Sequence, residues 1–151
     1  MVKIILAAVL TTLMTDPILA TTTSLRPVAL GTVLSHAYQI ELITKPGQVG
    51  KEGVAKAVFK PVGDFKWNKD YPASFVIPSE EIPVATPLKT KLGREDFKVS
   101  GQHRILCIPF TGKEAGRFPV EGLLNFSVCN EKGCLVFRNQ KLTLTFIVVK
   151  K

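Results

Sequence analysis

The sequence predicts an all-β sandwich of about eight short strands, and two observations carry this prediction. Short runs rich in β-branched and aromatic residues recur at intervals of roughly 8–12 residues. Ten prolines and 11 glycines interrupt these runs, as turn residues do between the strands of a sandwich. Beyond the N-terminal stretch, no segment keeps a 3.6-residue apolar period, so we expect no amphipathic helix.

The first 20 residues have the pattern of a secretory signal peptide. Lys3 supplies a basic start, residues 4–14 form an apolar core, and Ala20 ends the stretch with a small residue suited to cleavage. The alternative is an ordinary N-terminal strand. Because a membrane span needs ~20 apolar residues, we expect cleavage, no integral membrane segment afterwards, and a soluble exported chain in a compartment where disulfides persist.

The length of 151 residues indicates one domain after this signal. We expect residues 21–35 to form a flexible lead-in and residues 36–151 to form the sandwich domain. The formal net charge is +8, but the basic residues are scattered, without a run of five like charges and without aromatics interleaved with arginines. We therefore expect no nucleic-acid partner, and the charge favours solubility and acidic partners.

The strands predicted before the cysteine pair follow from the alternation of apolar and polar residues and from the turn residues that separate the strands. Tyr38, Ile40 and Leu42 alternate with polar residues, as in a half-buried strand. Two prolines limit residues 79–90 to short edge strands, and residues 92–96 indicate a loop. The predicted extended segments are 38–42, 54–60, 65–67, 75–77, 97–100 and 105–110.

The third cysteine of the chain, Cys107, lies in the last of these segments. Residues 105–110 are apolar on both faces, which predicts a buried central strand. A buried free cysteine behaves as a small hydrophobe, so we expect Cys107 to be unpaired and unreactive. His103 shares its face by strand parity, but a zinc site would need more ligands than this, and we expect no metal and no cofactor.

The remaining cysteines, Cys129 and Cys134, flank a four-residue stretch whose Asn130 and Gly133 tolerate the backbone of a tight turn. Extended runs enter and leave this stretch, which predicts a β-hairpin with the cysteines at its tip. If they lie directly opposite, their Cα atoms are roughly 5.5 Å apart, which suits a disulfide.

Strand parity predicts where the cysteine pair faces. Val128 and Leu135 fall on the core face, while both cysteines fall on the more polar face, where another protein's thiol can reach them. The apolar parity changes later in the returning strand, which predicts a bulge near Asn139 and Gln140.

Three segments resemble the N-terminal periplasmic domain of the DsbD thiol:disulfide interchange proteins. They are Phe126–Leu135 around the cysteines, Gly63–Pro72 with its aromatics and Tyr-Pro turn, and Val99–Phe110. The resemblance implies an immunoglobulin-like sandwich in the periplasm. It further implies a redox pair made by Cys129 and Cys134, with Cys134 as the attacking residue.

The same resemblance implies the partners, which are thioredoxin-like proteins or a membrane thiol reductase joined by a transient mixed disulfide. The family shields its cysteine pair with a cap loop. Residues 88–97 correspond to this loop, but they carry three basic residues and no aromatic before Phe97, so no cap residue is transferred.

Two function classes follow. One is a thiol:disulfide oxidoreductase that passes electrons through Cys129 and Cys134, in which Lys132 would favour a thiolate and Glu131 would oppose it. The other is a non-catalytic immunoglobulin-like binding or structural module of the cell envelope, with a structural disulfide. No serine lies in a nucleophile-elbow motif, so the sequence does not indicate a hydrolase.

Overall fold

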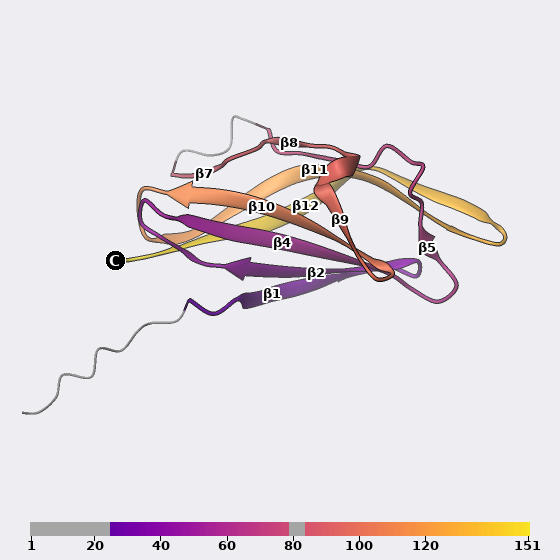
Figure 1. Ribbon diagram of the computed structural model, residues 1–151, viewed down its shortest axis with the longest axis horizontal. Helices are drawn as coiled ribbons and strands as arrows, with labels where there is room; N and C mark the ends of the chain where they lie inside the picture. The colour runs from indigo at the N-terminus through magenta and orange to yellow at the C-terminus, as the bar shows by residue number, and fades with distance from the viewer. Residues whose placement is uncertain (1–24, 79–83) are drawn as a thin grey trace, which may run out of the picture.

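The computed structural model describes residues 25–78 and 84–151, and in them the chain forms two packed β-sheets (Figure 1). The strands of the first sheet are β1 (Val28–Leu34), β2 (Tyr38–Lys45), β4 (Glu52–Pro61), β7 (Ala85–Pro87), β9 (Phe97–Ser100) and β10 (His103–Gly112). Their order is β1-β2-β4-β10-β7, and β9 also pairs with β10. The predicted signal peptide lies outside the described residues.

The second sheet contains the cysteine pair. Its strands are β3 (Gly47–Gln48), β5 (Lys66–Trp67), β6 (Ser74–Val76), β8 (Lys91–Leu92), β11 (Gly116–Asn130) and β12 (Gly133–Val149). Their order is β3-β12-β11-β6-β8, and β5 also pairs with β11. All pairs in both sheets are antiparallel except that of β3 with β12. The prediction of an all-β sandwich is confirmed.

The core lies between the two sheets and follows from strand alternation. In β4, Ala55, Ala57 and Phe59 point inward and are at most 1% exposed, while Lys56 on the opposite face is exposed. The small alanines leave room for large rings from the facing sheet. Phe126 of β11 is fully buried there, and its ring stacks on Trp67 at 5.5 Å and on Phe137 at 5.0 Å between centroids.

The first sheet begins earlier in the chain than we expected. Residues 28–34, which fall in the predicted lead-in, form the edge strand β1 and pair with β2. This strand has no regular alternation because most of its residues are exposed and a bulge at Gly31 interrupts its register. The segment forms a strand because it pairs with the free edge of β2. The local sequence pattern does not indicate this pairing.

The longest strands, β11 and β12, have 15 and 17 residues and are much longer than the predicted short strands. Their register shifts between Leu124 and Phe126, which pair with Gln140 and Phe137. Asn139 lies in this bulge with a φ of 51°, and its N–H donates to Asn125 Oδ1 at 2.9 Å. The bulge predicted near Asn139 and Gln140 is therefore confirmed.

The prediction for Cys107 is correct in one part and wrong in another. Cys107 is a free thiol on the central strand β10. It is only half-buried, because its side chain lies on the outer face of the first sheet, while Leu106 and Ile108 point into the core. An apolar run predicts burial on both faces only where a second layer covers each face, and the second sheet covers just one.

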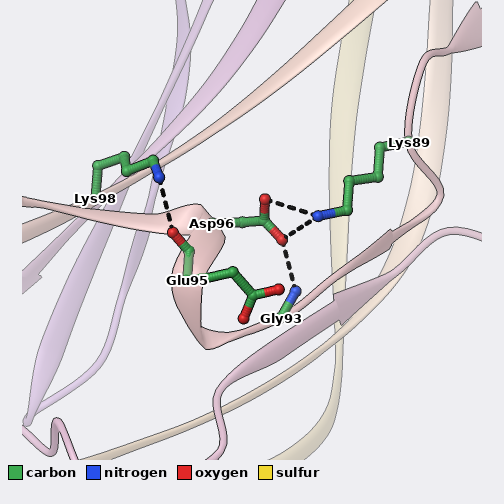
Figure 2. Close-up of polar contacts among 5 residues, drawn as sticks. All are labelled: Lys89, Gly93, Glu95, Asp96 and Lys98. Atoms are coloured by element: carbon green, nitrogen blue, oxygen red, sulfur yellow. Dashed lines mark hydrogen bonds and ion pairs between the residues drawn. The ribbon is translucent and has the colours of Figure 1, made fainter.

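The segment before β9 is fixed by a compact polar turn (Figure 2). Residues 94–96, in the predicted loop, form a short 3-10 turn. Asp96 accepts a hydrogen bond from the Gly93 N–H at 2.8 Å and pairs with Lys89 at 2.6 Å. This turn delivers Phe97 to the core, where its ring centroid lies 5.4 Å from that of Trp67.

Candidate functional site

The disulfide between Cys129 and Cys134 joins two residues that lie directly opposite each other on β11 and β12. One further pair, Asn130 with Gly133, separates it from the two-residue turn formed by Glu131 and Lys132. The cysteine Cα atoms are 4.0 Å apart, closer than the expected 5.5 Å. The difference reflects the pleat, since non-hydrogen-bonded pairs lie near 4.5 Å.

The turn next to the disulfide is held by the residues that the sequence singles out. Asn130 Oδ1 accepts a hydrogen bond from the Lys132 N–H at 3.0 Å, as an Asx turn does. Gly133 has a φ of 147°, which favours glycine. Asn130 Nδ2 also donates to Asp64 Oδ1 at 3.4 Å, which links the turn to the segment before β5.

The two sulfur-bearing residues differ in exposure. Cys134 is exposed, whereas Cys129 is half-buried because β5 runs beside β11 at that point. Val128 is 1% exposed and Leu135 packs against the core, as parity predicts. In Figure 1 the β11–β12 turn lies at the end of the molecule opposite the C-terminus. A visiting protein therefore reaches Cys134 more readily than Cys129.

The strand β5 supplies the part of the site that the sequence did not reveal. Lys66 pairs with Cys129, and Trp67 pairs with Val128. The next residue, Asn68, anchors this contact, because its N–H donates to the Ser127 carbonyl oxygen at 2.9 Å and its side-chain amide lies 3.3 Å from Ser127 Oγ. The alternation in this segment predicts a short strand, but not the strand with which it pairs.

Two open depressions border the disulfide. The first, of about 670 Å³, lies on the β5 side, and the second, of about 340 Å³, lies on the other side. Cys134 contributes to both. Polar and charged residues of the β5 segment and the turn dominate the first depression: Asp64, Lys66, Asn68, Lys69, Asp70, Asn130 and Glu131. The second is formed largely by His36, Phe65 and Leu135 with residues of the turn.

The other positions considered from the sequence lie elsewhere. No residue of the segment 88–97 lines either depression. His103 and Cys107 lie on β10 in the first sheet. Within residues 25–78 and 84–151, no three side chains of the metal-ligating types His, Cys, Asp and Glu gather as a metal site would require. In the same residues, no helix has the length and apolar character to cross a membrane.

Two comparisons of the sequence with known proteins gave no match. No protein-family model matches the chain, and no curated protein matches it significantly.

The arrangement has the chemical components of thiol–disulfide exchange. It presents a disulfide whose Cys134 is exposed, a second cysteine that could serve as leaving group or resolving thiol, and a lysine, Lys66, paired in register with that second cysteine. The open depressions on both sides leave room for a partner chain to align its own sulfur with the bond.

Proposed function

We propose that this chain is an exported thiol–disulfide interchange protein that passes electrons through Cys129 and Cys134, as its resemblance to the DsbD N-terminal domain implies. The observation that carries the proposal is the placement of this disulfide. The bond lies at an exposed end of the sandwich, with Cys134 accessible between two depressions. The proposed compartment is the periplasm, and the proposed partners are thioredoxin-like proteins or a membrane thiol reductase.

A structural role accounts less well for this bond. In the chain-entropy description a disulfide stabilises more as its loop lengthens, and a loop this short gives only about 2 kcal/mol. The two sheets already bury a core with five fully buried phenylalanines, namely Phe59, Phe75, Phe110, Phe126 and Phe146. A sandwich of this size therefore needs no staple at its end.

The exchange reaction balances with a protein dithiol as the reductant. A partner thiolate attacks Cys134 Sγ, a new S–S bond forms between the two proteins, and the Cys129–Cys134 bond breaks with its electron pair on Cys129 Sγ. The partner's second thiolate then attacks its own sulfur in the mixed disulfide and releases Cys134 as a thiolate. The partner ends as a disulfide, and this chain ends with two reduced cysteines.

Trapping of the mixed disulfide tests this function. Cys129→Ser keeps the exposed sulfur and removes the residue that would resolve the adduct. The partner is a thioredoxin whose resolving cysteine is replaced by serine and whose remaining cysteine is first converted to a mixed disulfide with 5-thio-2-nitrobenzoate. Cys134 Sγ attacks this disulfide and 5-thio-2-nitrobenzoate leaves with the electron pair. We expect a lasting adduct between the two proteins, visible on non-reducing gels. Cys134→Ser should form several-fold less adduct, because Cys129 is half-buried.

The control for this experiment is the double variant Cys129→Ser with Cys134→Ser, which retains Cys107 alone and should form none of this adduct. Equal adduct from the double variant would assign the reaction to Cys107, and no adduct from either single variant would contradict the proposal.

The alternative is a non-catalytic binding module, and one observation favours it. The edge strand β1 contains no charged residue from Val28 to Leu34, and no other described strand pairs with its outer edge. Uncharged edges are where another chain can add a strand. This role predicts a complex with a partner that still forms when both cysteines are replaced. The interchange role predicts that the same replacement abolishes the complex.

A further inference from the structure

We infer that Lys66 stabilises the thiolate of Cys129 and so makes Cys129 the leaving group when a partner thiol attacks Cys134. This inference rests on the proposed function and adds a residue to it. Neither the position nor the role of Lys66 follows from the cysteine motif, because Lys66 lies 63 residues before Cys129 in the sequence.

The register of the second sheet places three residues in one row. Lys66 of β5 pairs with Cys129 of β11, and Cys129 pairs with Cys134 of β12. Side chains of directly paired residues lie on the same face of a sheet, with Cβ atoms roughly 4.5–5.5 Å apart. Lys66, Cys129 and Cys134 therefore share one face, and the four-carbon stem of lysine can carry its ammonium group over the Cys129 sulfur.

The backbone around Lys66 is fixed although its side chain is exposed. Its neighbour Trp67 stacks on the buried ring of Phe126 with an interplanar angle of 9°. After Trp67, the Asn68 N–H donates to the Ser127 carbonyl oxygen at 2.9 Å. The start of the lysine side chain is thus held beside Cys129, and only its flexible end moves.

Other charges face the cysteine pair, and their distribution explains why we assign the role to Lys66. The groups on the β5 side are Asp64, Lys69 and Asp70 from the loop and Glu131 from the turn, and those on the opposite side are His36 and Lys132. The carboxylates oppose a thiolate. Of these charged groups and Lys66, only Lys66 is an in-register neighbour of a cysteine.

The effect on the reaction follows from leaving-group chemistry. When the S–S bond breaks, negative charge develops on the sulfur that leaves, and a thiol with a lower pKa leaves faster. A cation beside Cys129 lowers the pKa of its thiol by favouring the charged form. The electron pair of the broken bond is therefore directed to Cys129, and the new bond forms at the exposed Cys134.

The pKa of the Cys129 thiol tests the assignment. In a background of Cys107→Ser and Cys134→Ser, Cys129 is the single thiol, and its titration is followed by thiolate absorbance. We expect Lys66→Met to raise this pKa by about half a unit to one unit, and Lys66→Arg to leave it within about 0.3 unit. Lys69→Met is the matched control from the same depression and should also leave it within about 0.3 unit.

The full disulfide form gives a second readout. Dithiothreitol, which attacks as its thiolate, should reduce the Lys66→Met disulfide roughly two- to threefold more slowly than the unaltered one at low salt. The ratio should approach one at about 1 M salt, where screening removes the charge effect. A structural effect of the substitution would persist in salt, and unchanged tryptophan fluorescence of Trp67 shows that the aromatic cluster is intact.

The outcomes separate this inference from the proposed function. An unchanged Cys129 pKa in Lys66→Met, with mixed disulfides still formed, overturns the role of Lys66 alone. A pKa that depends on Lys66, together with no mixed disulfide, supports the electrostatic assignment and contradicts the proposed function.

Discussion

Phe126 occupies the centre of the aromatic cluster and lies on β11, three residues before Cys129. Its ring is fully buried and contacts four others: it stacks on Trp67 and Phe137, Tyr38 meets it edge-on at 4.9 Å, and Phe59 lies tilted against it at 5.7 Å. Since Trp67 belongs to β5 and Phe137 to β12, this one ring holds together the strands on both sides of the site.

Truncation of this ring tests its role. We expect Phe126→Ala to lower the free energy of unfolding by about 3–5 kcal/mol, because it opens a cavity among rings that cannot close over it. Urea unfolding followed by Trp67 fluorescence measures the loss. Phe126→Leu, a change of smaller volume, should cost less than about 1.5 kcal/mol.

The control for this substitution is Val136→Ala, at a residue that is 45% exposed on the same hairpin. Its effect should stay within about 0.5 kcal/mol. Equal losses for Phe126→Ala and Val136→Ala would show that the aromatic cluster does not stabilise this end of the sandwich.

At the scale of single elements, the turn formed by residues 94–96 is held by a carboxylate. Burial by itself raises the pKa of Asp96, but hydrogen bonds from Lys89 and the Gly93 N–H, with the charges of Lys89 and Lys98, bring this pKa below its ordinary value. Figure 2 shows the Lys89 ammonium and the Gly93 N–H bonded to the Asp96 carboxylate, while Lys98 donates to the Glu95 carbonyl oxygen.

A lowered pKa gives this turn a defined pH dependence. The ionised carboxylate stabilises the fold above the ordinary aspartate pKa near 3.9, and this contribution is lost as the pH falls through the lowered pKa of the folded state. We expect Asp96→Asn to cost about 0.5–1 kcal/mol near neutral pH, a small value because the Lys89 side chain is 50% exposed.

Urea unfolding at several pH values measures this effect. The difference from the unaltered chain should shrink as the pH falls below the ordinary aspartate pKa and vanish once the carboxylate is protonated in the folded state as well. Glu95→Gln, at the adjacent acidic residue, is the control and should change stability by less than about 0.5 kcal/mol throughout. A pH-independent loss in Asp96→Asn would contradict the electrostatic origin.

The sequence places neither β1 nor the pairing of β5, for different reasons. β1 pairs with the next strand, β2, but lacks regular alternation, whereas β5 pairs with the distant strand β11. Lys66 and Trp67 alternate with their neighbours as a strand should, yet only the fold shows that they lie against Cys129 and Val128. The partner of a two-residue strand depends on tertiary contacts that local patterns do not contain.

At the scale of the whole molecule, features with strong local signals could be predicted. The turn residues Asn130 and Gly133 and the parity of Val128 and Leu135 define the cysteine pairing that the structure contains. The prediction of burial failed for Cys107, because a run that is apolar on both faces does not reveal that a second sheet covers only one of them.

The arrangement of the sheets also places the hydrophobic core and the disulfide in different parts of the molecule. The core lies between the sheets, whereas the disulfide lies at the end of the molecule and on the outer face of the second sheet. We therefore expect reduction of the bond to leave the core contacts in place, as the proposed exchange function would require.

The reduction potential of the Cys129–Cys134 pair tests the central claim most directly. Equilibration of the Cys107→Ser chain with glutathione buffers of graded ratio, followed by alkylation of free thiols, gives the potential. We expect a value well above about −300 mV, in the range of disulfides that exchange with thioredoxin-like proteins. A value below about −300 mV would show a bond that resists reduction and would contradict electron transfer through this pair.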